Sequence, residues 1–512
     1  MITNYKLTDL QENSIEKMSK MSACILALSP GCGKSLCVLH YLEHILLKEN
    51  IDSKCILFIP KSARAAFKKE LDTKLELQES DYIFITAGKH ISYEDMSKRR
   101  YIIVENSVVN KYIEDLVALA STNECHLVID EAHSLQNPKS VFASAAWEVR
   151  CYCKKIIAMT ATPLLNDIEG LFNVLHFVYP RVFQSWFKFR SRYCVTQDRS
   201  IRMKNRFGAV VQRNITEIIG FKNMEELNSI LDKLIIKGCV HYNVNFNFLE
   251  CDLDKECEKL YAMAAKGFFD ILYHPEKVKK KKTKKKEDDT STSTSIADDA
   301  KDFGARLHDL QRVCDGSDDS VGENFVSNKM KLMCQTVFDI VKKNESTLIY
   351  FEYIDTLELA EKILLENKDM IGFNNVYKLT GAEKEDYRAK IESSLGLKDV
   401  VLCSQAASQS RNLQRANNII VMNCPFSCGR VVQLCGRVCR VDTTYSSQNI
   451  YFISVKDTID TYRTTLLKKR IGLIKLLLGD ESMGALDGCD CNYIDVDYSD
   501  TKELKKHFLW KK

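Results

Sequence analysis

Short runs of consecutive apolar residues alternate with longer amphipathic stretches in two separate parts of the chain. From Ala23 to Pro180 the runs are ACILAL (23–28), CILFIP (55–60), YIIVEN (101–106), HLVIDE (126–131) and KIIAMTAT (155–162). After Ser327 they are TLIYFE (347–352), NVYKL (375–379), DVVLCS (399–404), NNIIVMN (417–423) and NIYFIS (449–454). Continuous apolarity predicts strands buried on both faces, and helices between such strands are typical of a parallel, doubly wound sheet. The sequence therefore predicts two α/β lobes.

The stretch between the two lobes has mostly helical periodicity and contains a low-complexity segment. That segment, KVKKKKTKKKEDDTSTSTSIADD (277–299), is predicted to be a disordered loop. The residues after the last apolar run predict a long helix and then a polar tail. We therefore expect lobe 1 over 1–180, a helical linker over 181–326, lobe 2 over 327–456, and a C-terminal helix and tail over 457–512.

Composition and charge narrow the class of protein. Of the 512 residues, 45% are hydrophobic and 28% are charged, which is enough apolar content to order several cores and excludes a mainly disordered chain. The 73 basic and 69 acidic residues nearly balance, so any nucleic-acid-binding surface must be a local patch. No apolar run reaches the roughly 18–20 residues that span a bilayer, and the polar N-terminus does not have the pattern of a signal peptide.

The 20 cysteines are scattered along the chain, and this pattern favours reduced thiols in an intracellular compartment. We expect the cytoplasm in a bacterial setting, or the nucleus in a eukaryotic or viral one. Two close pairs, Cys151/Cys153 and Cys489/Cys491, have no second pair at zinc-ribbon spacing. Free thiols are therefore preferred to a metal cluster.

A glycine-containing turn follows the first apolar run. SPGCGKS (29–35) lies between that strand and an apolar helix, which is the context of a phosphate-binding loop. Backbone N–H groups of such a loop close around phosphates at a helix N-terminus. Lys34 would reach the β- and γ-phosphates, and the Ser35 hydroxyl would ligate Mg²⁺. The predicted cofactors are ATP and Mg²⁺, and the loop residues are Gly31, Cys32, Gly33, Lys34 and Ser35.

Two further strands end in residues suited to ATP hydrolysis. HLVIDEAH (126–133) ends in Asp130, which would hold Mg²⁺, and Glu131, which would polarise the attacking water. An acidic pair facing solvent is the alternative, and the upstream phosphate loop disfavours it. In TATPLLND (160–167), Thr160 and Thr162 could relay the state of the γ-phosphate, or they could simply cap a turn.

Together these motifs resemble those of helicase superfamily 2, and the residues around them resemble the Swi/Snf-type ATPases. IPKSARAAFKKE (59–70) is similar to a motif of that family in which Phe67 here replaces a Trp. DEAHSLQNPKS (130–140) and the segment 160–180 also resemble family motifs. LTDLQ (7–11) is similar to the adenine-recognition element, which makes Gln11 its candidate. The resemblance covers most of residues 7–475 and implies two RecA-like lobes.

The second lobe contains a pair of arginines in QLCGRVCR (433–440). Arg437 and Arg440 lie one helical turn apart, and two guanidinium groups on one face need phosphates or carboxylates as partners. The resemblance implies that they are arginine fingers with Gln433 nearby. A solvated charged face is the alternative.

The resemblance also implies nucleic-acid contacts, and the chain departs from the family in two places. SQAASQSRNL (404–413) stands where the family has a glycine-rich loop, and LIIKGC (234–239) stands where it has an Arg-Arg-x-Lys element. The nucleic-acid candidates are Lys61, Ser62, Arg411 and Asn412.

The function implied by the resemblance is an ATP-dependent, DNA-stimulated motor that translocates on duplex DNA and remodels DNA or protein–DNA complexes. One alternative is a strand-separating or branch-migrating helicase acting on DNA or RNA. A second alternative is a nucleotide-dependent scaffold that binds nucleic acid with little turnover. The lysine run 277–286 is either a solvated loop, a DNA tether or a nuclear import signal. Duplex or branched DNA is the expected partner, and no membrane is expected.

Overall fold

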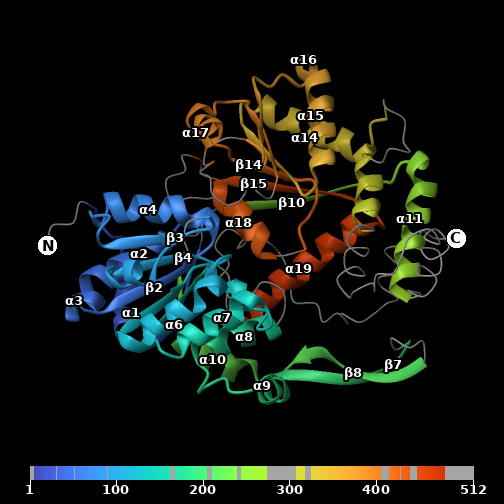
Figure 1. The fold of residues 1–512 in the computed structure, drawn as a ribbon. Helices are drawn as coiled ribbons and strands as arrows, with labels where there is room; N and C mark the ends of the chain where they lie inside the picture. Colours follow the sequence, from blue (N-terminus) through green and yellow to red (C-terminus); the bar gives the residue numbers. More distant parts are fainter. Residues whose placement is uncertain are drawn as a thin grey trace, which may run out of the picture. The chain divides into compact units, whose positions relative to one another are not determined.

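The structure is a computed structural model of the 512-residue chain. It describes residues 5–29, 31–50, 52–88, 90–161, 168–204, 210–238, 244–273, 307–317, 325–383, 385–404, 413, 415–426, 428–438, 445 and 447–478. The chain divides into two compact units (Figure 1). The first unit comprises Met1–Tyr242, Ser427–Asp442 and Lys469–Tyr498, and the second comprises Asn243–Phe426, Thr443–Lys468 and Ser499–Lys512.

The first unit is built on a seven-stranded sheet of order β3-β4-β2-β5-β6-β1-β9, in which every neighbouring pair is parallel. Its strands are β1 (Ala23–Leu28), β2 (Lys54–Ile59), β3 (Tyr82–Ile85), β4 (Tyr101–Glu105), β5 (Cys125–Ile129), β6 (Lys155–Thr160) and β9 (Ile235–Gly238). All residues of β4, β5 and β6 are buried. Because β5, β6 and β1 are parallel neighbours, the loops that follow them leave the same edge of the sheet.

Helices between the strands cover this sheet and supply its core. One core cluster joins Met18, Val38 and Leu39 from the helices to Leu26 and Leu57 from the strands. The α-helices of this unit are α1 (Asp9–Ser19), α2 (Lys34–Tyr41), α3 (Leu47–Glu49), α4 (Arg64–Thr73), α5 (Tyr93–Ser97), α6 (Ile113–Thr122), α7 (Val141–Arg150), α8 (Ile168–Val178), α9 (Trp186–Tyr193), α10 (Met224–Leu234) and α18 (Cys428–Val438). A π-helical turn, η1 (Leu42–Leu46), joins α2 to α3, and the 3₁₀ turns are η2 (Lys61–Ala63), η3 (Val109–Tyr112) and η4 (Ala132–Leu135).

The second unit has a parallel six-stranded sheet of order β10-β15-β14-β11-β13-β12. Its strands are β10 (Val244–Cys251), β11 (Thr347–Phe351), β12 (Val376–Leu379), β13 (Val400–Ser404), β14 (Asn418–Val421) and β15 (Gln448–Val455). Its helices are α11 (Lys255–Tyr273), a helix over residues 307–315, α14 (Asn328–Lys342), α15 (Ile354–Glu366), α16 (Lys368–Ile371) and α17 (Glu385–Ser394). Helix α19 (Ile459–Leu478) begins in this unit.

The predicted fold class is confirmed, because both sheets are parallel and carry helices. All ten predicted strands are present within two residues of their expected bounds. The structure adds β3, β9 and β10 to the sheets. It also adds an antiparallel pair, β7 (Cys194–Lys204) and β8 (Val210–Phe221), to a stretch whose pattern had favoured helices. The lysine-rich segment 277–299 and the tail after residue 478 lie outside the described residues.

Membrane association through a spanning helix finds no support in the part of the chain that the structure describes. None of its helices combines the length and the apolar character that crossing a membrane requires.

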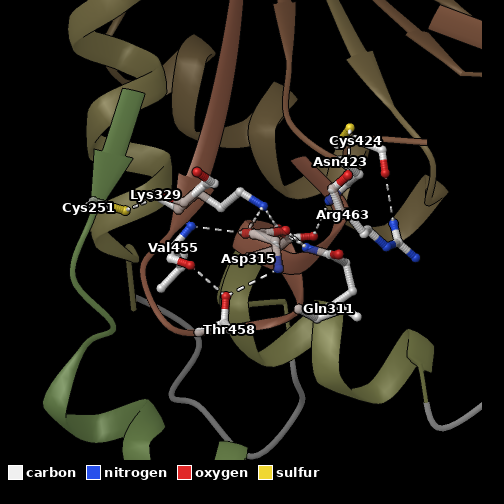
Figure 2. Close-up of polar contacts among 12 residues, drawn as sticks. Cys251, Gln311, Asp315, Lys329, Asn423, Cys424, Val455, Thr458 and Arg463 are labelled. Carbon is white, nitrogen blue, oxygen red and sulfur yellow. Dashed lines mark hydrogen bonds and ion pairs between the residues drawn. The ribbon is translucent and has the colours of Figure 1, made fainter. Parts of the chain in front are cut away.

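A buried network of charged side chains joins several helices of the second unit (Figure 2). Lys329, on α14, is fully buried, and its Nζ lies 2.7 Å from Asp315 Oδ1 and 2.7 Å from Asp460 Oδ2. Asp315 ends the helix over residues 307–315, and Asp460 lies in the first turn of α19. The ion pairs therefore connect the helix over residues 307–315 and α14 with α19, which comes much later in the sequence.

Neutral donors complete the hydrogen bonding of the two carboxylates. Gln311 Nε2 donates to Asp460 Oδ1 at 2.6 Å, Asn423 Nδ2 donates to Asp315 Oδ2 at 2.9 Å, and Thr356 Oγ1 donates to the same oxygen at 3.0 Å. Burial raises the pKa of Asp315, and the Lys329 ammonium opposes that shift. Charges this deeply buried are retained only when they are paired and hydrogen-bonded, so the network fixes how these helices dock.

Arg463 makes a second buried attachment of α19 to the same unit. Its guanidinium is 2% exposed and donates to Glu352 Oε2 at 2.7 Å and to the hydroxyl of Tyr353 at 3.0 Å. It also lies over the ring of Phe426, 4.2 Å from the ring centroid. The start of α19 is thus held to this unit by one ion-pair cluster and one arginine.

Candidate nucleotide-binding site

The loop after β1 has the backbone conformation expected of a phosphate-binding turn. Gly31 and Gly33 have φ values of 83° and 70°, in the left-handed region that glycine adopts without steric cost. Helix α2 starts directly afterwards at Lys34, whose Nζ donates to the carbonyl of Leu28 at 2.7 Å and to that of Ser29 at 3.4 Å. The ammonium group is therefore held at the end of β1, beside the N-terminus of α2.

Gln11 contacts this loop from the helix that precedes the sheet. Gln11 and Thr8 form a capping box at the start of α1, in which Thr8 N donates to Gln11 Oε1 at 3.0 Å. The Gln11 Nε2 group donates to the carbonyl of Cys32 at 3.0 Å. Gln11 is 7% exposed, so it is not a surface side chain. A Cβ added at Gly33 would overlap Gln11 Nε2, so any other residue there would have to displace the Gln11 side chain.

Gly33→Ala is expected to lower nucleotide affinity by tenfold or more, because it combines a strained positive φ, a cost of about 1–3 kcal/mol, with displacement of Gln11. Titration with a fluorescent ATP analogue measures the effect. Gly88→Ala is the matched control: Gly88 has a φ of 90°, but an added Cβ there meets nothing within 4 Å. Equal affinities for the two variants would contradict a role for the Gly33–Gln11 contact.

The two carboxylates that follow β5 lie at the same edge of the sheet. Asp130 is buried, and its Oδ1 accepts a hydrogen bond from Glu131 N at 3.0 Å. Glu131 adopts a left-handed conformation with φ 52°, an unusual backbone state for a non-glycine residue that is typical of functional sites. Glu131 Oε2 lies 3.1 Å from His133 Nδ1.

Electrostatics link these groups to the phosphate loop. Burial, and then the neighbouring charge of Glu131, raise the pKa of Asp130, while Lys34 opposes the shift. Burial and the charge of Asp130 raise the pKa of Glu70, on α4, to about 7. A divalent cation beside Asp130 would favour its ionised form, and hydroxyl and carboxylate oxygens are the ligands that Mg²⁺ prefers. The donor set of Ser35 and Asp130 therefore fits magnesium.

The structure places the remaining first-lobe candidates as follows. Thr160 is buried at the end of β6, where it pairs with Ala27 of β1, next to the phosphate loop. Lys61 is exposed and Ser62 half-buried in η2, which follows β2. Thr162 lies outside the described residues. Phe67, which replaces the family's Trp, is fully buried in the core.

Of the candidates near the arginine motif, Gln433 is the one whose side chain the structure describes. Residues 427–442 belong to the first unit, and Gln433 Nε2 donates to Glu131 Oε1 at 3.4 Å. Arg437 lies one turn further along α18. Arg440, Arg411 and Asn412 lie outside the described residues.

Three features of this site were not predicted from the sequence. The first is the closeness of the Glu131 carboxylate to His133, and the second is the effect of the Asp130 charge on the pKa of Glu70. The third is the ion pair of Arg64 with Glu105, whose side chain is almost fully buried, at 3.0 Å. The motifs 59–70 and 130–140 contain His133, Arg64 and Glu70, but only the fold gives these residues their partners.

A glycine loop, a lysine at the start of a helix and an acidic pair after another parallel strand of the same sheet define the class of P-loop nucleoside triphosphatases. The SNF2-related domain family matches residues 12–315, and the helicase conserved C-terminal domain matches residues 328–442. The chain therefore belongs to the SNF2-related family, within the Swi/Snf-type ATPases of helicase superfamily 2. It is an ATP-hydrolysing enzyme of that superfamily.

Several curated relatives resemble the chain at low identity. An uncharacterized ATP-dependent helicase of Bacillus subtilis, YqhH, is 22% identical over 492 residues, which are 92% of this chain and 79% of the relative. The DNA repair and recombination protein RDH54 of Saccharomyces cerevisiae is 20% identical over 506 residues, 92% of this chain and 51% of that protein. Chromodomain-helicase-DNA-binding protein 1 of Gallus gallus is 24% identical over 198 residues, 37% of this chain. The chain matches only 11% of the length of that protein.

Among solved structures, the SWI2/SNF2 ATPase core of Sulfolobus solfataricus in complex with dsDNA is 19% identical to the chain. The alignment covers 98% of this chain and 97% of that one, with a TM-score of 0.40.

Proposed function

We propose that the chain is an ATP- and Mg²⁺-dependent, DNA-stimulated motor that translocates on duplex DNA and remodels DNA or protein–DNA complexes. The observation that supports the proposal is that Glu131 follows β5 at the sheet edge where the loop after β1 also lies, with its carboxylate 3.1 Å from His133 and its backbone N–H bonded to Asp130. A scaffold that only binds nucleotide would not need a positioned base. Membership of the SNF2-related family and relatives named for DNA repair and chromatin remodelling support DNA as the track.

Each residue of the site has a distinct task in this proposal. The backbone of Gly31–Gly33 and the ammonium of Lys34 bind the phosphates of ATP. Gln11 recognises the adenine of ATP. Ser35 and Asp130 would hold Mg²⁺, which supplies positive charge to the phosphate oxygens when it is bound. Glu131 accepts the proton of the attacking water, since its carboxylate is oriented by His133.

Further residues are assigned as the resemblance implies. Arg437 and Arg440 act as arginine fingers together with Gln433, and Thr160 and Thr162 couple the nucleotide state to the rest of the motor. Lys61, Ser62, Arg411 and Asn412 are the proposed nucleic-acid contacts, and such contacts to phosphate carry no sequence preference. The division into lobes over 1–180 and 327–456, with a linker between them and a C-terminal helix after them, is part of the proposal.

An intracellular, reducing compartment is also inferred. The 15 cysteines whose side chains the structure describes are free thiols, and 11 of them are buried. Burial raises the pKa of thiols such as Cys24 and Cys37 to about 12, which keeps them protonated and unreactive.

The direct test is ATP turnover by the purified chain without polymer and with single-stranded DNA, duplex DNA, branched DNA or RNA. The proposal expects the largest stimulation with duplex or branched DNA. Stimulation by RNA but not by DNA would contradict the proposal. Turnover that neither DNA nor RNA changes would show that the chain is not a nucleic-acid-stimulated motor.

Translocation on a duplex that stays paired is expected to displace the third strand of a DNA triplex. Displacement should need ATP and should be lost in Lys34→Ala and Arg437→Ala, while a forked duplex stays mostly intact under the same conditions. Gel separation of labelled strands measures both reactions. Efficient unwinding of the fork without triplex displacement would favour the strand-separating helicase instead.

A further inference from the structure

The antiparallel pair β7–β8 stands apart from both large sheets. Its register runs from Cys194 opposite Phe221 to Lys204 opposite Val210, with one irregularity near Val195, and neither strand pairs with any other described strand. Figure 1 shows it as a long green ribbon that extends from the end of α9. Eleven residues of β7 span roughly 35 Å at ~3.3 Å per residue. We refer to residues 194–204 and 210–221 as the arm.

The base of the arm is firmly attached to the first unit. Arg192, at the end of α9, makes a two-pronged ion pair with Glu226 of α10, with N–O distances of 2.7 and 2.8 Å. Tyr193 donates to the same carboxylate at 2.9 Å, and Asn223 Nδ2 donates to the carbonyl of Arg192 at 2.8 Å. Tyr193 and Cys194 are buried. The direction in which the arm leaves α9 is therefore fixed by packing and by charged hydrogen bonds.

Next to this base, both faces of the arm are uncovered where the structure describes the side chains of β7. Residues 195–198 are all exposed, and successive residues of a strand point to opposite faces. Thr216, opposite Asp198, is also exposed and donates to its Oδ1 at 2.7 Å. An isolated two-stranded sheet gains little stability from its own contacts. A separate two-stranded arm on a fixed base, exposed at residues 195–198, is thus suited to contact another molecule.

The outer half of the arm concentrates positive charge. Its strands carry Arg199, Arg202, Lys204 and Arg213, and residues 199–216 contain no Asp or Glu. This contrasts with the whole chain, in which 73 basic and 69 acidic residues nearly cancel. The register sets Arg213 opposite Ile201, so Arg199 and Arg213 are at positions on one face, while Arg202 and Lys204 are at positions on the other.

We propose that the arm binds the phosphate backbone of the duplex DNA on which the motor moves. The inference rests on the proposed function and adds a contact that lies outside both large sheets. Four cations at register positions of strands that have no Asp or Glu between residues 199 and 216 favour a polyanion as the partner, and binding to phosphates does not depend on base sequence. The major groove, about 12 Å wide, admits a two-stranded ribbon. A grip of this kind keeps the duplex attached between steps.

The test compares two fourfold variants that change net charge equally. The arm variant carries Arg199→Gln, Arg202→Gln, Lys204→Gln and Arg213→Gln. The control carries Lys17→Gln, Lys20→Gln, Lys98→Gln and Lys154→Gln, all exposed positions of the same unit. Affinity for a duplex DNA is measured at several salt concentrations, together with ATP turnover in the presence and absence of that DNA.

The arm variant should lose at least tenfold in affinity, and its slope of log K against log salt should fall by about 2–4, since each lost phosphate contact removes ~0.9. Turnover without DNA should not change. The double variant Arg202→Gln, Lys204→Gln should give about half of the slope change. Such a graded change would show that the loss does not come from misfolding of the fourfold variant. A slope and affinity equal to those of the control would overturn the proposal, and so would a loss seen with duplex RNA but not with DNA.

The result also separates this inference from the proposed function. If the unaltered chain shows no stimulation by any DNA, the proposed function fails. If the unaltered chain is stimulated and the arm variant behaves as the control does, only the role of the arm is wrong.

Discussion

Glu131→Gln should still bind ATP and should hydrolyse it about 10²-fold more slowly or worse, the usual cost of removing a general base. Glutamine keeps the size of the side chain, and its carbonyl oxygen can replace one of the two carboxylate oxygens, either Oε2 at 3.1 Å from His133 Nδ1 or Oε1 at 3.4 Å from Gln433 Nε2. It cannot accept a proton from water. Single-turnover hydrolysis with duplex DNA, together with an independent binding titration, separates the two effects.

Two further variants are compared with Glu131→Gln, one expected to lose nucleotide binding and one expected to behave as the unaltered chain. Lys34→Ala removes the ammonium group at the loop and should lose most nucleotide affinity. Glu124→Gln is the matched control, because Glu124 lies immediately before β5, at the opposite edge of the sheet, and pairs with Lys154 at 2.9 Å. Its turnover should equal that of the unaltered chain. Near-normal turnover by Glu131→Gln in the presence of DNA would show that another group is the base.

Lys329→Met should destabilise the second unit by about 3–5 kcal/mol, the cost of breaking a buried ion pair by removing one partner. The substitution leaves Asp315 and Asp460 facing each other without a cation, although both are almost completely inaccessible to solvent. Hydrogen exchange followed by mass spectrometry measures the loss, because peptides from α14 and α19 report on the docking of these helices directly. Faster exchange should appear in both helices together.

Lys331→Met provides the control for that substitution. Lys331 lies on the same helix and is exposed. Its Nζ donates to Asn328 Oδ1 at 3.4 Å, a long hydrogen bond at the surface. Its replacement should leave exchange unchanged. Adding Asp315→Asn to Lys329→Met should recover part of the stability, since it removes one of the two uncompensated charges. Equal exchange in Lys329→Met and Lys331→Met would contradict the role of the network.

The strands that are easiest to predict from the sequence are those formed by a continuous run of buried apolar residues. Every residue of β4, YIIVE, is buried, and such runs are recognisable without knowledge of their neighbours. Strand β9, IIKG, continues directly from α10, and it becomes a strand because it pairs with β1. Strand β10 reads VNFNFLEC, in which polar residues interrupt the apolar run. For β9 and β10, tertiary pairing decides the outcome, and local pattern does not.

The candidate site also contains residues that chain order predicts and contacts that only the tertiary structure determines. Gly33, Lys34 and Asp130 follow strand ends, and chain order is enough to bring such residues to one edge of a parallel sheet. The second contact of Gln11, which caps α1 and also reaches the carbonyl of Cys32, needs the packing of α1 against the loop. The coupling of Glu70 to Asp130 likewise depends on where α4 lies, and no spacing in the sequence encodes that distance.

The position of β10 also has a consequence for how the chain is made on the ribosome. β10 is the outermost strand of its sheet and pairs only with β15, 204 residues later in the sequence. At synthesis rates of about 5–20 residues per second, β10 emerges roughly 10–40 s before its partner exists. During that interval its N–H and C=O groups present an open edge, the kind of template to which other nascent strands can add. Translation that stalls before Gln448 would prolong this exposure, so the yield of soluble protein should depend on elongation speed through residues 252–447.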